Sequence, residues 1–368
     1  MNFKKHLLIY NARLITKDKI INKAWVLIKA GRIKKCGRGK NIPKVRADKI
    51  NARNHYLSPG FIDLHIHGNI EVISKTQSKY GTTAFLHCLS ADRIDRILRK
   101  IKKEKQLKLQ ASPCLGFYLE GPFLSQNMAG GQPRRFIIEP DKHKLGCLLK
   151  TTAKDIKIIT LAPEQKGAFR LIKILNKNHI ITSLGHSNAS FATVRKAVDM
   201  GACYATHGFN RMSGLTARNP GLITAMLIDD RITTEVIADG HHVHPALLKL
   251  LVKNKPLDKI ILVTDSVAAE DKRTQKLKAG VYRLKDATIS GSNLTMITAI
   301  KNMVELGGVD IKSAVTMAAL NPAKTIGLSR RKGSIAKGKD ADIVIFDKDF
   351  KVRMTIISGN IVWNKLVN

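Results

Sequence analysis

The chain has 368 residues, of which 44% are hydrophobic and 25% charged, a balance typical of a globular protein with a sizeable core. No hydrophobic run approaches the ~20 residues needed to cross a bilayer, and the N-terminus lacks a signal-peptide pattern, so we expect a cytoplasmic protein that does not bind membranes. The formal net charge is +36, but the basic residues are spread along the chain and only 5% of residues are aromatic, which argues against nucleic-acid recognition.

The cysteines are dispersed, odd in number and contain no CxxC pair: Cys36, Cys88, Cys114, Cys147 and Cys203. This pattern favours neither a disulfide framework nor a thiolate zinc site. We interpret these residues as reduced, mostly buried thiols.

Both ends of the chain have the pattern of short β-strands. The first 55 residues contain the runs HLLIYNARLI, AWVLIKAGRI and KKCGRG, and residues 331–368 contain DADIVIFD and VRMTIISGNIVWN. Both terminal segments have the same pattern of short strands, and a long middle section separates them. They could therefore pair with each other in one sheet. We therefore predict one small β-sandwich domain built from residues 1–55 and 331–368.

The middle section, residues 56–330, alternates short apolar runs with stretches of helical periodicity, such as RIDRILRKIKKEK and FATVRKAVDMG. Eight runs are candidate strands: PGFIDLHI, TTAFLHC, LGFYLE, IKIITLA, IITSLG, CYATHG, TTEVIAD and KIILVTD. Eight βα repeats predict an α/β fold, a (β/α)8 TIM barrel, in which the chemistry lies at the carboxyl ends of the strands.

The first barrel strand carries a pair of histidines with metal-chelating spacing. Because side chains alternate along a strand, Asp63, His65 and His67 share one face, and Gly68 lets the chain turn away after them. Two imidazoles directed at one point suit a divalent metal. A lone pair of this kind would equally fit surface or core histidines.

Four further strand ends carry a metal ligand or a carboxylate: Glu120, His186, His207 and Asp265. Taken singly, Glu120 could be a surface acid and Asp265 could cap the next helix. Together they describe a nitrogen and oxygen site suited to Zn, Fe, Mn or a similar ion. Asp265 follows the eighth strand, next to the first in a closed barrel, where a carboxylate can accept the proton of a metal-activated water.

Ordered motifs along nearly the whole chain resemble one known family. They are PGFIDLHIHG, LEGPFL, LAPE, GHSNAS, ATHGFNRM, NPGL, VIADGHHVHP, LVTDS, ISGSNLTM, NPAKTIGL and GSIAKGKDADIVIFD. With these motifs the chain resembles the N-acetylglucosamine-6-phosphate deacetylases of the amidohydrolase superfamily. The resemblance implies hydrolysis of N-acetylglucosamine 6-phosphate to glucosamine 6-phosphate and acetate.

The resemblance also implies roles for single residues. Glu120, His186 and His207 would hold the principal metal, His65 and His67 could hold a second, and Asp265 would be the general base and acid. Zinc is the expected ion, with Fe, Mn or Co as alternatives. The expected substrate-binding residues are Gly131, Gln132, Asn210, the backbone of Arg211, Arg218, His242, Ile289, Ser290 and Gly291. Arg218, taken alone an ordinary surface arginine, would come from the partner subunit of a homodimer.

Three departures from the family pattern concern loops around the site. Gln132 stands where the family presents a histidine that contacts the substrate carbonyl. Only residues 69–80 connect the first two barrel strands, which predicts a minimal crossover and a reduced lid. The segment after Asp265 is short, and Arg211 occupies a normally small position beside the phosphate site.

Two other functions remain compatible with the sequence. A related amidohydrolase could use the same metal site on another N-acyl amine or a cyclic amide. The altered loops and the +36 charge would also suit a catalytically weakened barrel retained as a scaffold or associated with nucleic acid.

Overall fold

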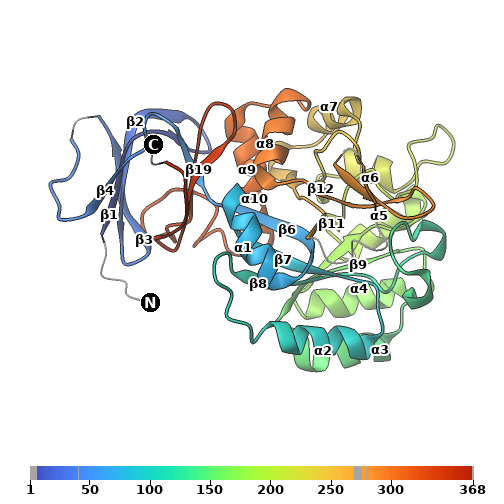
Figure 1. The fold of residues 1–368 in the computed structure, drawn as a ribbon. Coiled ribbons are helices and arrows are strands. Elements are labelled where there is room, and N and C mark those ends of the chain that lie inside the picture. The colour runs from blue at the N-terminus through green and yellow to red at the C-terminus, as the bar shows by residue number, and fades with distance from the viewer. Residues whose placement is uncertain (1–5, 40, 269–275, 279, 367–368) are drawn as a thin grey trace.

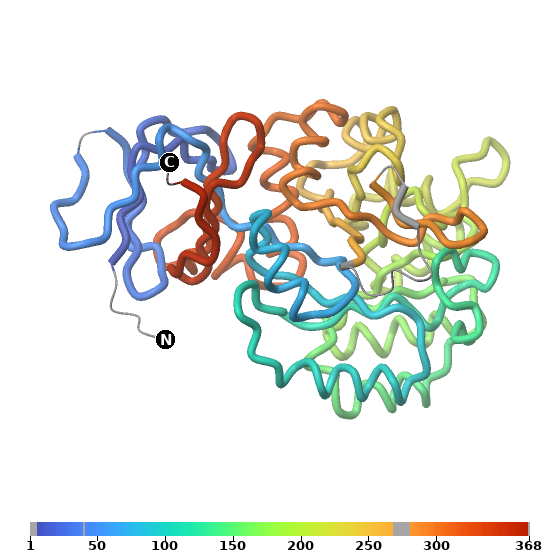
Figure 2. Tube along the Cα trace, in the orientation of Figure 1, coloured from blue at the N-terminus to red at the C-terminus, as the bar shows by residue number. Residues whose placement is uncertain are grey.

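Two hydrogen-bonded sheets organise the residues that the computed structural model describes, which are 6–39, 41–268, 276–278 and 280–366 (Figure 1). One sheet is formed by the two ends of the chain. The other is formed by the middle section and carries the strands on which the candidate site was predicted. Figure 2 shows the N-terminal and C-terminal segments, blue and red, side by side at one end of the molecule.

The terminal sheet runs in the order β20-β19-β18-β5-β1-β2-β3, with β4 also paired to β1. Its strands are β1 Leu7–Ile15, β2 Ile20–Lys29, β3 Arg32–Arg38, β4 Asp48–Asn51, β5 Tyr56–Pro59, β18 Ile343–Phe346, β19 Val352–Ile357 and β20 Asn360–Asn364. The antiparallel pairing of β5 with β18 joins the two parts of this sheet, although Tyr56–Pro59 lies just beyond the predicted terminal segment 1–55. Ile9, Val26 and Ile356, from strands across this sheet, are buried in one hydrophobic cluster, so the sheet encloses its own core.

The second sheet contains a run of neighbouring parallel strands from β6 to β13. These are β6 Phe61–Gly68, β7 Thr82–Ser90, β8 Cys114–Glu120, β9 Ile156–Leu161, β10 Ile181–Leu184, β11 Tyr204–Ala205, β12 Thr233–Val236 and β13 Ile260–Leu262. They match the eight strands predicted from the sequence. Most of their residues are buried, because helices cover one side of a parallel sheet and packed side chains fill the other.

The segment after β13 connects the last parallel strand with the first. Three residues separate β14 Ser266–Ala268 from β13, and β14 pairs in parallel with β6, with Ser266 opposite Ile66. The backbone N–H of Asp265 also donates to the carbonyl oxygen of His65, at 2.9 Å. The sheet is therefore curled, and Asp265 lies beside His65. Beyond it, β17 Ile289–Ser292, β16 Val281–Arg283 and β15 Lys276–Lys278 extend the edge at β14.

Helices surround the outer side of the curled sheet (Figure 1). They are α1 Ile70–Gln77, α2 Ile94–Glu104, α3 Lys142–Thr152, α4 Ala168–Lys177, α5 Phe191–Asp199, α6 Leu222–Ile228, α7 Pro245–Asn254, α8 Met296–Glu305, α9 Ile311–Ala318 and α10 Leu320–Thr325. In α5 the Ser190 side chain accepts a hydrogen bond from the N–H of Thr193, and Val194, Ala197 and Val198 form the buried face. None of the described helices has the length and apolar character that crossing a membrane requires.

The first crossover is as short as the sequence predicts. Residues 69–80 contain only α1 and a 3-10 turn, Ser78–Tyr80. The side chain of Asn69 starts α1 by accepting from the N–H groups of Glu71 and Val72. Residues 269–275, part of the segment that we expect to be shortened, lie outside the described residues.

Candidate metal centre and active site

The predicted ligands meet at the carboxyl ends of the parallel strands. His65 and His67 lie on β6, Glu120 ends β8, and His186 and His207 each follow the end of a strand by two residues. All are buried to a large extent, and even His67, the most open of them, has a side chain only 14% exposed. The curled sheet thus brings together residues that are up to 142 positions apart in the chain.

The first donor group consists of Glu120, His186 and His207. Oε1 of Glu120 lies 2.8 Å from the Nε2 atoms of both histidines, which are 3.1 Å from each other. His186 Nδ1 donates to the Met128 carbonyl oxygen, at 2.8 Å, so Nε2 is the ring nitrogen that faces the other two donors. In a tetrahedral site with ligand atoms about 2.0–2.1 Å from the ion, neighbouring ligand atoms are about 3.3 Å apart. The donor atoms of this group are spaced 2.8 to 3.1 Å apart, so the group fits a divalent cation.

The second donor group consists of His65 and His67. Their Nε2 atoms are 3.2 Å apart and lie 3.6 and 3.4 Å, respectively, from Oε2 of Glu120. His65 Nδ1 contacts Oε2 of Glu235 at 2.8 Å, the type of outer contact that orients a metal-ligating imidazole. Glu235 is fully buried and was missed by sequence reasoning, although a carboxylate inside the predicted strand TTEVIAD was an available signal.

Asp265 lies between this second group and the solvent. Its Oδ1 is 3.3 Å from His67 Nε2 and 3.7 Å from His65 Nε2, and its side chain is 15% exposed. Burial alone would raise the pKa of Asp265, but the hydrogen bond from His67 and the charges of both histidines hold this pKa below its ordinary value. The carboxylate is therefore ionised at neutral pH and able to accept a proton.

Glu120 is also held ionised. Burial would raise its pKa, yet the charge of His65 and the hydrogen bonds from His186 and His207 keep the pKa well below the usual range. Burial likewise opposes protonation of His65 and His67, but the negative groups around them hold the pKa of both histidines well above its ordinary value. A divalent cation would displace protons from such a cluster, since metal ligands must be deprotonated.

Three of these residues have unfavourable backbone conformations. His186, His207 and Asp265 have φ angles of 46°, 29° and 46°, in the left-handed region that residues other than glycine rarely adopt. Such conformations cost on the order of 1–3 kcal/mol each and cluster at active sites. Their coincidence at three strand ends is an independent indication that these positions are functional.

A cavity of about 650 Å³ opens over the donor atoms. Its walls include every predicted substrate-binding residue except Arg218: Gly131, Gln132, Asn210, Arg211, His242, Ile289, Ser290 and Gly291. Arg218 is exposed in the loop between β11 and α6, outside this lining. The structure of this single chain therefore brings together all but one of the predicted residues.

Gln132 lies in the wall of this cavity, and its side chain also contacts Glu120. Its Nε2 donates to Oε2 of Glu120 at 2.6 Å, and its Oε1 accepts from the N–H of Ala91 at 2.8 Å. The two bonds fix the orientation of the amide. Gln132 thus supports the carboxylate of Glu120 from the side of the cavity.

His242 is oriented by Asp239 at the far wall of the cavity. The Nδ1 atom of His242 lies 2.6 Å from Oδ2 of Asp239, while Oδ1 accepts from the backbone N–H groups of His241 and His242. Burial would raise the pKa of Asp239, but the contacts with His242 lower it. The ring is therefore held by an ionised carboxylate, as is suitable for contact with an anion.

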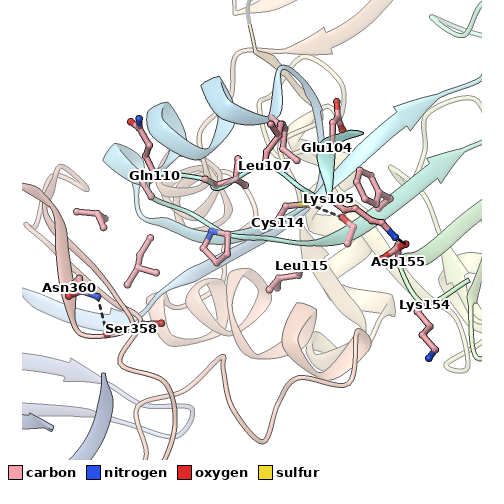
Figure 3. Close-up of a pocket in the computed structure, with 18 residues that line it drawn as sticks. Glu104, Lys105, Leu107, Gln110, Cys114, Leu115, Lys154, Asp155, Ser358 and Asn360 are labelled. Atoms are coloured by element: carbon pink, nitrogen blue, oxygen red, sulfur yellow. Dashed lines mark hydrogen bonds and ion pairs between the residues drawn. The ribbon is translucent and has the colours of Figure 1, made fainter. Parts of the chain in front are cut away.

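Another cavity, of about 630 Å³, lies at the opposite ends of the strands. Figure 3 shows Leu107, Cys114 and Leu115 inside it, with Ser358 and Asn360 of the terminal sheet at one side. At about 3.3 Å per residue, β8 separates Cys114 from Glu120 by about 20 Å. The two cavities share no lining residue.

Comparison with known proteins identifies relatives over nearly the full length. The model of the amidohydrolase family matches residues 56–362. N-acetylglucosamine-6-phosphate deacetylase of Bacillus subtilis strain 168 is 33% identical, covering 97% of each chain. N-acetylgalactosamine-6-phosphate deacetylase of Escherichia coli O157:H7 is 32% identical, covering 83% of this chain and 87% of the relative.

Solved structures agree with this relationship. N-acetylglucosamine-6-phosphate deacetylase from Pasteurella multocida is 30% identical, covers 97% of this chain and 99% of its own, and superposes with a TM-score of 0.89. A mutant of the Mycobacterium smegmatis deacetylase, in complex with N-acetyl-D-glucosamine-6-phosphate, is 28% identical with the same coverage and a TM-score of 0.88.

Proposed function

The chain belongs to the N-acetylglucosamine-6-phosphate deacetylase family of amidohydrolases, and on this basis we propose that it deacetylates N-acetylglucosamine 6-phosphate. The products are glucosamine 6-phosphate and acetate. The observation that carries the proposal is the convergence of Glu120, His186 and His207 beside an ionised Asp265, at the floor of a cavity of suitable size.

Glu120, His186 and His207 are the proposed ligands of the principal metal, and His65 and His67 contribute to a second. Zinc is our first choice, with Fe, Mn or Co as alternatives, because imidazole and carboxylate ligands accept each of them. A bound ion of this kind lowers the pKa of water to about 7 and polarises a carbonyl oxygen.

Asp265 is the proposed proton carrier. It accepts the proton of the attacking water and then donates it to the sugar nitrogen as the bond between that nitrogen and the acetyl carbon breaks. Its position suits both steps, because Oδ1 lies 3.3 Å from Nε2 of His67 and 15% of the side chain is exposed. Gln132 keeps the carboxylate of Glu120 in place throughout.

The phosphate group is proposed to bind at Asn210, the backbone of Arg211 and His242, which line one cavity. Arg218 would complete this site from the partner subunit of a homodimer, since in its own chain it lies outside the lining. Ile289, Ser290 and Gly291, with Gly131, face the sugar. The net charge of +36 would accelerate capture of an anionic substrate.

The pairing of β14 with β6 and of β13 with β12 supports a closed (β/α)8 barrel. We propose that this barrel is one domain and that the terminal sheet is the other. The boundary then lies near residue 60, since β5 at Tyr56–Pro59 belongs to the terminal sheet.

The test is hydrolysis by the purified, metal-loaded protein. N-acetylglucosamine 6-phosphate should be deacetylated with release of acetate, and unphosphorylated N-acetylglucosamine should react far more slowly, because it lacks the anion that His242 and its neighbours bind. A panel of N-acyl amino acids and cyclic amides serves as the comparison. If the protein does not hydrolyse the sugar phosphate but hydrolyses an N-acyl amino acid or a cyclic amide, the proposed substrate is wrong.

N-acetylgalactosamine 6-phosphate is a second candidate substrate. The Escherichia coli relative that carries this name is nearly as similar as the first, at 32% identity. The two sugars differ only in the configuration of one hydroxyl group. The ratio of their kcat/KM values will decide which of them this cavity prefers.

A further inference from the structure

Cys88 lies in the wall of the candidate metal centre. It is on β7, next to the strand that carries His65 and His67, and only 2% of its surface is exposed. The preceding residue, His87, contacts Glu104 at 2.7 Å and the Gly68 carbonyl oxygen at 2.8 Å, away from the centre. Because neighbouring residues of a strand point to opposite sides, Cys88 points inward.

The thiol has metal ligands as neighbours. One donor atom each from His65, His67, Cys88 and Glu120 can be chosen so that all four lie within 4.8 Å of one another. A free buried cysteine that serves only packing behaves as a small apolar side chain among other apolar side chains. Cys88 belongs to the main hydrophobic cluster, but it also lies beside two imidazoles and a carboxylate.

The geometry of Glu120 divides the centre into two parts. Oε1 faces His186 and His207 at 2.8 Å, while Oε2 faces His67 at 3.4 Å and His65 at 3.6 Å. Gln132 donates to the same Oε2, which leaves this oxygen one further lone pair. One carboxylate can therefore bridge two adjacent ions.

We propose that Cys88 is a metal ligand, and that His65, His67, Cys88 and Oε2 of Glu120 form a thiolate-containing second site beside the principal one. The thiol proton is released as the ion binds, because the thiolate is the ligand. Sulfur and imidazole donors favour Zn²⁺, Co²⁺ or Fe²⁺ over Mg²⁺ and Ca²⁺, which prefer oxygen. The inference rests on the metal centre of the proposed function and is independent of the sugar substrate.

An ion can reach this second site through open space. A cavity of about 320 Å³ is lined by Cys88, His67 and Ser90, and it shares His67 and Ser90 with the larger cavity over the principal donors. The thiol is thus buried in the protein and still faces a solvent-connected space. This position suits a ligand at the edge of a centre that exchanges ions with solution.

The experiment uses the full chain, depleted of metal and then titrated with Co²⁺ alone. A thiolate bound to Co²⁺ gives an intense charge-transfer band in the near ultraviolet, which imidazole and carboxylate ligands do not give. We expect this band in the unchanged protein, with about two equivalents of cobalt bound. Cys88→Ser should lose the band and about one equivalent, while Cys147→Ser, which alters an exposed cysteine, should keep both.

Cys88→Ala serves as the second variant, and far-ultraviolet circular dichroism verifies that each variant is folded. A band that persists in folded Cys88→Ser and Cys88→Ala, or the absence of the band from the unchanged protein, overturns the assignment. Turnover of N-acetylglucosamine 6-phosphate is measured separately. If that activity is absent and the cobalt band depends on Cys88, the proposed substrate fails and the thiolate site stands.

Discussion

Two cavities of nearly equal volume, about 650 and 630 Å³, lie at opposite ends of the same parallel strands. Of these two, only the first is lined by the candidate metal ligands. In the carboxyl-end cavity, Glu120 lies 2.8 Å from His186, and Asp265 lies 3.3 Å from His67. At the amino-end cavity, Lys105 and Asp155 form a partly exposed pair at 3.0 Å, a contact worth little to stability or function.

The two ends of the strands differ in the kind of residues that surround each cavity. At the carboxyl ends, buried donors face one another, and His186, His207 and Asp265 have left-handed backbone conformations. At the amino ends, Leu107, Leu115 and the Ser358–Asn360 turn surround a space between the strands and the terminal sheet (Figure 3). Cavity volume is therefore a poor guide to function here, and the direction of the strands is a good one.

The strongest test of this contrast is Asp265→Asn. The amide cannot accept the proton of the attacking water, so kcat should fall by about 10²- to 10⁴-fold. The ligands of the principal ion remain, and metal analysis should find it still bound. If kcat of the variant is within tenfold of that of the wild-type protein, Asp265 is not the proton carrier.

Glu235→Gln should weaken the second ion without removing the first. The substitution takes away the charge next to His65 Nδ1, and loss of such an outer contact typically lowers metal affinity by about 10- to 100-fold. Competition with a chelator measures the affinity of each ion. Equal weakening of both ions, or of neither, would contradict the division into two donor groups around Glu120.

Asp239→Asn should affect substrate binding more than the chemical step. The amide cannot hold His242 as the carboxylate does, so KM for the sugar phosphate should rise by about tenfold while kcat changes little. Asp258→Asn, which alters an exposed acid on the outer surface, is the matched control. A fall in kcat with unchanged KM would mean that His242 takes part in catalysis instead.

The amino-end cavity should give the smallest effects. Burial raises the pKa of Cys114 to about 11, so at pH 8 about one such thiol in a thousand is ionised, against about one in ten for an ordinary thiol with a pKa near 9. Its alkylation rate should therefore keep rising to about pH 11, while that of an ordinary small-molecule thiol levels off earlier. Peptide mass spectrometry measures the rate at Cys114.

Cys114→Ser completes this comparison, because it changes the amino-end cavity alone. We expect kcat/KM within about twofold of the unchanged protein, since no predicted ligand lies near this end of β8. A loss of activity comparable to that of Asp265→Asn would show that the two cavities are functionally coupled.

The sequence by itself determined the positions of the eight strands and of their polar ends. Each strand is a local apolar run, and the position of His65, Glu120 or His207 at its end is visible without knowledge of the other strands. Because parallel strands place their carboxyl ends at one edge, local patterns were sufficient to predict that these residues meet.

Only the tertiary structure decided what surrounds these ligands. The contact of Glu235 with His65 spans 170 residues, and that of Gln132 with Glu120 depends on how a loop folds over a strand end. Cys88 seemed an ordinary thiol until the register of β7 against β6 placed it beside two imidazoles. Such contacts depend on the pairing of distant strands and the course of loops, which no local periodicity encodes.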